Sequence, residues 1–166
     1  MKKILVRAAL VLTALMLFIA LILAIEYFGG QPMGFFTGKR PSSLGFTGGK
    51  FTPPSWKPNT VSSTVEKTDT THFIAPLNIA GDTAAAWKKL LAQVKGTPRV
   101  TVITEQPNYL YTEFKTVGLG FIDDVEFALD APANVIHVRS GSRLGVRDFG
   151  VNRARLEAIR TAMETK

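Results

Sequence analysis

The longest apolar run in the chain lies near its N-terminus and decides where the protein can fold. The 18 residues from Ala8 to Ile25 carry no charge and contain neither glycine nor proline. A run of this length is typical of a helix that crosses a membrane. The sequence therefore predicts a membrane anchor over residues 1–28, in which Ala8–Ile25 forms the transmembrane helix.

A cleaved signal peptide is the alternative interpretation of this segment. It requires a short apolar core followed by small residues at a cleavage site. A cut after Ala24 would place the large side chain of Ile22 at the third position before the cut. Lipoprotein processing needs a cysteine, and the chain has none. We therefore expect an uncleaved signal-anchor and keep cleavage as the second interpretation.

Basic residues on either side of the run predict its orientation. Lys2, Lys3 and Arg7 precede it, whereas no basic residue follows it before Lys39. Positive charge beside a membrane span tends to stay in the cytoplasm. The sequence predicts a single-pass protein of the cytoplasmic (inner) membrane, with its N-terminus inside and its domain facing the periplasm or the outside.

The charge of the rest of the chain is moderate. Of 20 basic residues three precede the span, which leaves 17 against 13 acidic residues and a net charge of +4. A nucleic-acid-binding protein usually shows a clearer basic stripe, so we expect no nucleic acid as partner. Attraction to anionic lipid headgroups stays open, since the anchor would keep the domain near a membrane.

Residues 29–60 separate the anchor from the regular part of the chain. They are rich in Gly, Pro, Ser and Thr, and no period of 2 or 3.6 residues runs through them. This composition predicts a Gly/Pro-rich linker. Aromatic residues interrupt it and leave open that its second half packs on the domain; they are Phe35, Phe36, Phe46, Phe51 and Trp56.

Residues 61–166 show the periodicities of a folded domain. An alternating run at 72–79 contains Pro76, which favours an edge strand. A helix follows, capped by Asp82 and stopped at Gly96. Four further strand-like runs with short connections predict antiparallel pairing, and a last helix extends from about Asp148 to Thr165. The fold class is therefore α+β, a two-layer domain with a five-stranded, mostly antiparallel sheet and two helices on one face.

The last helix directs polar side chains toward the sheet. Asn152 and Arg155 lie on or beside its apolar face, and burying either group without a partner costs about 1–3 kcal/mol or more. In the run at 123–130, the two-residue period places Asp123 on the same covered face. We expect a structural ion pair between Arg155 and Asp123. A polar pocket that closes on a ligand is the alternative.

Charged residues on the opposite face are expected to pair across strands. Arg139 and His137 point away from the helices, and so do Asp124 and Glu126 on the neighbouring run. Opposite charges that face each other on adjacent strands stabilise a sheet. We expect such pairs here, with His137 as the partner of Glu126.

Two other arginines lack an obvious protein partner. Arg143 and Arg147 lie between the last strand and the last helix, where only Asp148 is near in sequence. Arginines beside the free N–H groups of a helix start can hold a phosphate or carboxylate. We therefore expect an anion- or ligand-binding site, formed by Arg143, Arg147, Ser140, Ser142 and Asn152. The alternative is that Asp148 caps the helix and pairs with Arg147.

Several kinds of catalytic or metal site find no support. The chain has two histidines and no cysteine, so we expect no metal site and no cofactor. No G-x-S-x-G motif of a serine hydrolase occurs. Asp123 and Asp124 are adjacent on a strand and point to opposite faces, so they cannot act together as acid and base unless the strand bulges there. An enzyme is the less favoured interpretation.

Several motifs of the chain resemble those of a known family. They are "LGFTGGKF" (44–51), "FIAPL" (73–77), "GFIDDVEF" (120–127) and "IHVRSGSRLGVRDFGVNRARLEAIR" (136–160). In this combination the chain resembles the bacterial and plastid family catalogued as domain of unknown function 1499, from about residue 44 to residue 163. The resemblance implies a membrane-anchored or exported protein and no settled activity.

The resemblance adds Asn59, Ser62 and Ser63 to the residues of interest. They join an expected polar cluster, structural or functional, of Asp123, Asp124, Arg139, Arg155, Asn59, Ser62 and Ser63. The alternative for the three added residues is a turn that hydrogen-bonds its own backbone. Relatives often carry cysteine at the positions of Pro54 and Thr60, which implies that this chain has lost a family disulfide.

Two functions follow from these expectations. The favoured one is a membrane-anchored, extracytoplasmic binding or accessory module of the cell envelope, whose partner is an envelope protein or an anionic ligand. Tyr109 and Tyr111 support it, because tyrosines beside charges are common at interfaces. The alternative is an enzyme acting on an anionic envelope or lipid substrate, with Asp123 or Asp124 as base. A carboxylate base works best in a dry pocket without a cationic partner, and Arg155 is the expected partner of Asp123.

Overall fold

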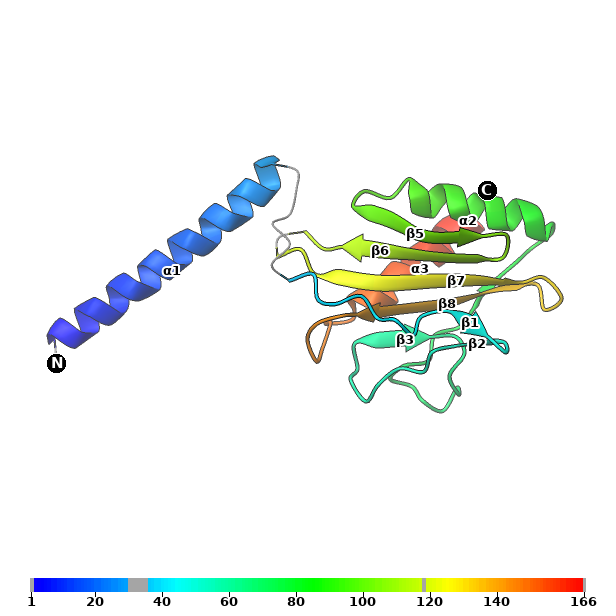
Figure 1. The fold of residues 1–166 in the computed structure, drawn as a ribbon, viewed down its shortest axis with the longest axis horizontal. Coiled ribbons are helices and arrows are strands. Elements are labelled where there is room, and N and C mark those ends of the chain that lie inside the picture. The colour runs from blue at the N-terminus through cyan, green and yellow to red at the C-terminus, as the bar shows by residue number, and fades with distance from the viewer. Residues whose placement is uncertain (1, 30–35, 118, 166) are drawn as a thin grey trace.

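The computed structural model of the protein describes residues 2–29, 36–117 and 119–165. Its N-terminal helix, α1 (Lys2–Gly29), stands apart from a folded domain (Figure 1). The 22 residues Lys3–Ala24 of α1 have a mean hydropathy of 2.6, and none of this stretch is buried. At 1.5 Å per residue they extend about 33 Å, enough to cross a hydrocarbon core of about 30 Å. The helix fits a membrane anchor, and by length and composition it equally fits a signal sequence.

One antiparallel sheet forms the centre of the domain. Its strands follow the order β3-β8-β7-β6-β5, and β4 pairs with β8 beside β3. The strands are β3 (Thr60–Ser62), β4 (Leu77–Asn78), β5 (Val100–Gln106), β6 (Tyr109–Lys115), β7 (Ile122–Asp130) and β8 (Val135–Ser142). The expected α+β class and the mostly antiparallel sheet are confirmed.

The sheet has six strands where the sequence predicts five. The added strand is β3, and its three residues are too few to show an alternating pattern. The run expected at 72–79 contributes only the two residues of β4, directly after Pro76. Both short strands lie along the same edge of β8, β3 beside residues 139–141 and β4 beside residues 135–136.

Two helices, α2 (Thr83–Lys95) and α3 (Val151–Glu164), pack on one face of the sheet. In Figure 1, α3 lies behind the sheet and α2 lies along its β5 edge. The Asp82 carboxylate accepts a hydrogen bond from the Ala85 N–H at 2.6 Å, and Gly96 ends α2, as the sequence predicts. The core between the layers is built from alternating strand residues and one stripe of each helix, namely Val61, Ile74, Leu77, Trp87, Leu90, Val94, Leu110, Phe114, Val125, Phe127, Ile136, Val138, Leu156 and Ile159.

The start of α3 differs from the expectation. The helix begins at Val151 rather than near Asp148, because Phe149 (φ 54°) and Gly150 (φ 82°) both adopt the left-handed conformation. The Asp148 carboxylate nevertheless accepts hydrogen bonds from the Gly150 N–H at 3.1 Å and the Asn152 N–H at 2.9 Å. Asp148 therefore caps the helix from outside its first turn.

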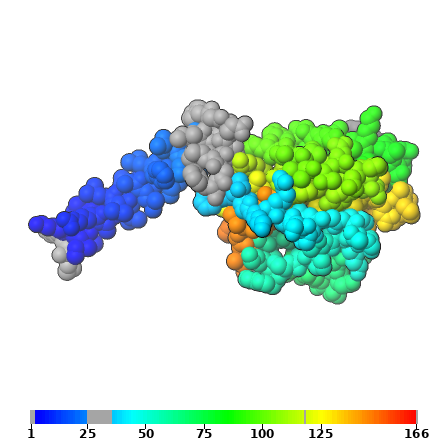
Figure 2. Space-filling view, viewed as in Figure 1, coloured from blue at the N-terminus to red at the C-terminus, as the bar shows by residue number. Residues whose placement is uncertain are grey.

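Residues 36–59, here called the strap, cross the face of the sheet opposite the helices and end at Asn59, which reaches Asn152 on the helix side. They include the two-stranded ribbon of β1 (Phe46–Thr47) and β2 (Lys50–Phe51). Figure 2 shows the strap, in cyan, across the front of the sheet. The sequence predicts a linker over 29–60, whereas the described part of that segment is folded, because its apolar and polar groups find partners on the sheet. Residues 30–35 of the expected linker lie outside the described residues.

Candidate functional site

The polar residues on the helix side of the sheet form one cluster around Arg155. The Arg155 guanidinium donates to Asp123 at 2.5 Å and lies 4.9 Å from the ring centre of Phe114. It also donates to the Ser140 hydroxyl at 3.0 Å and the Asn152 side-chain oxygen at 2.8 Å. The expected pair of Arg155 and Asp123 is therefore present and bridges α3 and β7.

The same cluster connects β8 to the chain before β3. The Asn152 amide donates to the Asn59 carbonyl at 3.0 Å and to the Ser142 hydroxyl at 2.9 Å. Ser142 in turn donates to Asp123 at 2.5 Å, and Ser140 donates to Asn152 at 2.5 Å. Because Asn152 and Ser140 are fully buried, these hydrogen bonds satisfy groups that would otherwise destabilise the core. This inner cluster comprises Asn59, Asp123, Ser140, Ser142, Asn152 and Arg155.

A second cluster lies on the opposite face, under the strap. Arg139 and Glu126 are directly opposite each other on β8 and β7, and their side chains form an ion pair at 2.9 Å. The Glu126 carboxylate is fully buried and also accepts from the Tyr109 hydroxyl at 2.8 Å. The expectation that His137 pairs with Glu126 is wrong, because Arg139 occupies the directly opposite position. His137 instead approaches Asp130 at 3.7 Å.

Arg143 is the centre of the rest of this cluster. Its guanidinium donates to both oxygens of Asp124, the shortest distance being 2.6 Å, and to the Tyr111 hydroxyl at 3.2 Å. It also forms an ion pair with Glu113. The expectation that Arg143 lacks a protein partner is wrong, because it continues the alternation of β8 and points to the same face as Arg139. This outer cluster comprises Tyr109, Tyr111, Glu113, Asp124, Glu126, Arg139 and Arg143.

The strap is hydrogen-bonded to the outer cluster at three points. Arg40 donates to Glu113 at 2.6 Å. The Gly45 N–H donates to Glu126 at 2.8 Å. Arg139 donates to the Thr52 carbonyl at 3.2 Å. Residues scattered over the strap thus share the charged side chains of the sheet, which explains how a segment with little apolar periodicity is held in place.

Burial and charge move two carboxyl groups of the outer cluster in opposite directions. Burial raises the pKa of Glu126, and the nearby Arg139, Tyr109 and Gly45 only partly offset this effect. Burial also opposes ionisation of Glu113, but hydrogen bonds and charges from Arg40 and Arg143 outweigh it and hold the pKa of Glu113 below its ordinary value. The Tyr109 and Tyr111 hydroxyls, buried beside carboxylates, have raised pKa values and act as donors.

A pocket of about 290 Å³ lies between the strap and the sheet. We call it the strap pocket. Its charged lining residues are Lys39, Lys57, Arg139, Arg143 and Asp124, and its neutral lining includes Asn59, Thr60 and Ser142. Arg139 and Arg143 have carboxylate partners, whereas the ammonium groups of Lys39 and Lys57 make no hydrogen bond or ion pair within the described residues. The pocket therefore carries an excess of positive charge.

A neighbouring pocket of about 440 Å³ is lined without any charged residue. Tyr109 and Tyr111 of the outer cluster line it, and Gln106, Asn108 and Phe46 are among its other lining residues. Of its lining residues, the sequence singles out Tyr109 and Tyr111 as a possible interface but none as an anion-binding residue.

The remaining expected site residues, Arg147, Ser62 and Ser63, belong to neither cluster. Arg147 is exposed in the β8–α3 loop and makes no ion pair or hydrogen bond within the described residues. The Ser62 hydroxyl accepts from the Thr64 N–H at 3.2 Å, which is the local turn kept as the alternative. Ser63 contacts the His137 ring at 3.2 Å and accepts from the Val138 N–H at 2.9 Å. Of the expected anion-binding residues, the strap pocket brings together only Arg143 and Ser142.

The sequence does not identify several residues of the outer cluster and of the strap as site residues. Glu113 shares its strand face with Tyr109 and Tyr111, so the two-residue period could have grouped these three with Asp124. Lys39, Arg40 and Lys57 carry no such signal, because the strap has no regular period. In the part of the chain that the structure describes, no group of three or more His, Cys, Asp or Glu could hold a metal ion.

Comparison with known proteins places the domain in a family. The family model described as "Protein of unknown function (DUF1499)" matches residues 50–163, which include the inner and the outer cluster but not the part of the strap before Lys50. No curated protein matches the chain. No solved structure matches it either. The match covers more than half of the chain and confirms the resemblance seen in its motifs; the protein belongs to the DUF1499 family of proteins of unknown function.

Proposed function

We propose that the protein is a membrane-anchored, extracytoplasmic binding module of the cell envelope, which holds a small anionic ligand in the strap pocket. The observation that carries this proposal is the lining of that pocket. Lys39 and Lys57 present ammonium groups without partners among the described residues, beside Arg139 and Arg143, and Asp124 is the one acidic residue of the lining. A phosphate or carboxylate group supplies the charge and the hydrogen-bond acceptors that these donors lack.

The partners of the two arginines decide which residues would select the ligand. Arg139 and Arg143 are held by Glu126, Asp124 and Glu113, so their charge is largely balanced within the protein. They form a rigid part of the lining. Lys39 and Lys57 add the unbalanced charge, and opposite charges attract more strongly in a partly enclosed pocket than in open water. The volume of about 290 Å³ suits a small ligand or one headgroup.

The positions of the carboxylates favour binding over catalysis. Asp123 accepts from Arg155 and Ser142, and Asp124 accepts from Arg143 and Tyr111. A carboxylate held in this way by an arginine is a poor proton acceptor. The enzyme acting on an anionic envelope or lipid substrate therefore remains the second candidate, without an observation that favours it.

The ligand proposal is tested by thermal unfolding of the full chain in detergent with increasing inorganic phosphate. A ligand that binds the folded state raises the unfolding temperature with its concentration. We expect phosphate to stabilise the wild type, and Lys39→Gln with Lys57→Gln to require at least about tenfold more phosphate for the same shift, equivalent to about 1.4 kcal/mol.

The matched control is Lys67→Gln with Lys88→Gln, which removes two exposed ammonium groups outside the pocket lining and lowers the net charge by the same amount. We expect this variant to respond to phosphate as the wild type does. A wild type that phosphate does not stabilise beyond the effect of equal ionic strength, or two double variants that respond alike, would contradict the proposal.

A further inference from the structure

The exposed apolar side chains of the domain gather at one end. Two loops form this end, the β6–β7 loop (described residues 116–117 and 119–121) and the β8–α3 loop (residues 143–150), together with the first residues of the strap and of α3. The exposed large hydrophobic residues there are Phe36, Val117, Leu119, Leu144, Val146, Phe149 and Val151. Elsewhere in the described domain only Trp56 and Val102 belong to this class. We call this region the anchor-side end.

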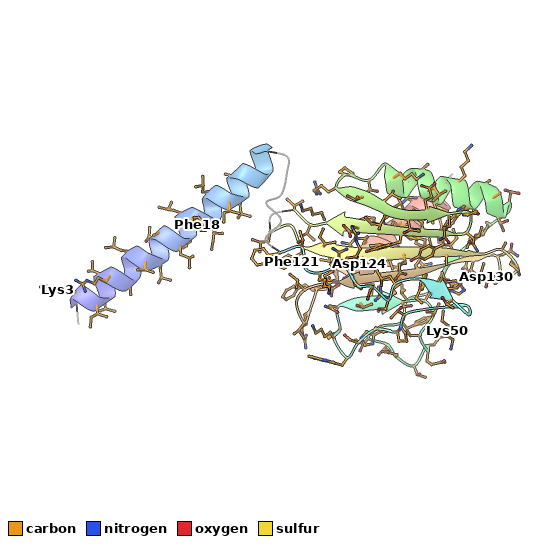
Figure 3. The ribbon with its side chains drawn as sticks, in the orientation of Figure 1. Lys3, Phe18, Lys50, Phe121, Asp124 and Asp130 are labelled. Atoms are coloured by element: carbon orange, nitrogen blue, oxygen red, sulfur yellow. The ribbon has the colours of Figure 1, made fainter. Side chains whose placement is uncertain are left out.

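The chain enters the domain at the anchor-side end. Phe36 packs against Phe121 in a tilted arrangement, with their ring centres 5.2 Å apart. Gly38 is so close to the β8–α3 loop that a Cβ there would lie 2.9 Å from the Arg143 Cβ. Figure 3 shows Phe121 at the end of the domain that faces α1 and Asp130 at the opposite end.

The connection between α1 and this end is short. Helix α1 ends at Gly29, and Phe36 is seven residues further along the chain. Because an extended chain spans at most about 3.6 Å per residue, the two are at most about 25 Å apart. If α1 spans a membrane, the anchor-side end cannot move far from the membrane surface.

Phe149 is the most exposed of these residues and the least favourable for folding. Its side chain is 95% exposed, and its backbone has a φ of 54°, a conformation that residues with a Cβ rarely adopt. Neither burial nor local conformation explains a phenylalanine at this position. Such conflicts with the local rules of folding are typical of functional positions.

The charge beside these apolar residues suits a lipid surface. Arg147 is exposed between Val146 and Asp148 and makes no ion pair within the described residues. The Asp148 carboxylate is turned to the N–H groups of Gly150 and Asn152. Exposed aliphatic and aromatic residues next to a free cation are typical of segments that insert into the headgroup region.

We propose that the anchor-side end is a membrane-docking face. Val117, Leu119, Leu144, Val146 and Phe149 enter the boundary between headgroups and acyl chains, and Arg147 binds lipid phosphate. This inference rests on the proposed insertion of α1 in a membrane, and it is independent of ligand binding in the strap pocket. It assigns a role to exposed apolar side chains that the fold itself leaves uncovered.

Because the chain contains no cysteine, one introduced cysteine can be labelled specifically with one nitroxide. The full chain is placed in lipid nanodiscs with a label at Val117→Cys or Phe149→Cys. Ala133→Cys, in the exposed turn at the opposite end, is the water control, and Leu15→Cys in α1 is the lipid control. Collision of the label with oxygen, which concentrates in lipid, is compared with collision with a water-soluble nickel chelate.

We expect the labels at 117 and 149 to resemble the label at 15, with a ratio of oxygen to nickel collisions several-fold above that of the label at 133. A label at 15 in lipid together with labels at 117 and 149 in water would overturn the docking face and leave the anchor intact. A label at 15 in water would overturn the anchor as well. Labels at 117 and 149 shielded from both reagents would indicate a protein partner or a second copy and would contradict lipid docking.

The role of Arg147 is tested in nanodiscs of phosphatidylcholine with and without phosphatidylglycerol. We expect the ratio at position 117 to rise when phosphatidylglycerol is present, and Arg147→Gln to remove most of that rise. Lys67→Gln, an exposed cation outside the anchor-side end, is the control and should keep the rise. An equal response of the two variants would show that Arg147 does not bind the headgroups.

Discussion

Two adjacent aspartates connect the sheet to the layers on its two sides. Asp123 points to the helix face and pairs with Arg155, whereas Asp124 points to the strap face and pairs with Arg143. Consecutive residues of a strand point to opposite faces, so the "DDVEF" motif supplies a carboxylate to each layer. Both aspartates are 2% exposed. Removing one partner of either pair would therefore leave the other charge buried without a compensating charge.

The pair of Asp123 and Arg155 makes a quantitative prediction. Removing one member of a buried ion pair costs about 3–5 kcal/mol, because the other charge stays buried. We expect Asp123→Ala and Arg155→Ala each to lower the free energy of unfolding by this amount, and the double variant to lose less than the sum. Urea unfolding of the full chain in detergent, followed by the fluorescence of the buried Trp87, measures it.

Lys95 and Glu105 provide the control for this cycle, since their ion pair is about 40% exposed on both sides. An exposed pair contributes at most about 1 kcal/mol. Alanine at either position should therefore have a small effect on the free energy of unfolding. Strict additivity of the Asp123 and Arg155 variants would mean that the two side chains do not interact.

The sequence predicts the inner cluster better than the outer cluster, because a regular periodicity covers the key residues of the inner cluster and stops short of Arg143. Periodicity alone places Asp123 and Arg155 toward each other, because each lies in an element long enough to show its apolar face. Arg143 lies just after the last residue of β8, and the glycines around it suggest a loop. Its N–H still donates to the Ile122 carbonyl at 3.2 Å, so the alternation continues one residue beyond the strand.

Among the elements, the strap depends most on ionised groups. It is fixed to Glu113, Glu126 and Arg139 by single hydrogen bonds or ion pairs, with the ribbon of β1 and β2 as its own regular structure. The strands β6, β7 and β8 are evident in the sequence because they are long and alternate. The strap and β3 are not, since runs of two or three residues have no measurable period and their positions follow from contacts distant in the chain.

Glu113 gives the strap a predictable dependence on pH. Arg40 and Arg143 hold its folded pKa below the ordinary value of 4.5, so the unfolded chain binds its proton more readily. The stabilisation is therefore complete above about pH 4.5 and is lost as the pH falls through the folded pKa. We expect Glu113→Gln to destabilise the protein by roughly 1–3 kcal/mol at pH 7, with the difference from wild type shrinking below about pH 4.5.

Urea unfolding of both proteins between pH 3 and pH 7 (roughly the range in which a carboxyl group titrates) measures this difference. The titration of Glu126 changes the free energy of unfolding of both proteins equally, so it cancels in the difference between them. Glu105→Gln, in the exposed pair with Lys95, is the control and should show a small difference at every pH. A difference for Glu113→Gln that stays constant over this range would rule out its ionisation as the cause.

At the scale of the whole molecule, helix α1, the strap and the sheet follow one another along the chain. Helix α1 leads to the anchor-side end, and the strap then crosses the outer face of the sheet before β3 begins (Figure 1). The strap pocket therefore lies in the part of the domain that is connected most directly to the proposed membrane span. Lys39, which lines the pocket, follows Gly38 at the anchor-side end. The proposed anchoring and the proposed ligand binding would thus involve neighbouring residues of one segment.

This arrangement works only if α1 remains attached and the domain lies outside the cytoplasm, which a fusion of alkaline phosphatase to the C-terminus tests. The phosphatase needs disulfides that form only in an oxidising compartment. Because Lys2, Lys3 and Arg7 should hold the N-terminus in the cytoplasm, we expect an active fusion in a bacterial host. The same fusion without residues 2–29 should be inactive, and the mass of the membrane-bound chain should include those residues.

An inactive full-length fusion would contradict the orientation. A mature chain that lacks residues 1–24 would contradict the anchor and, because nothing would then hold the exposed apolar loops near lipid, would also remove the basis of the docking face.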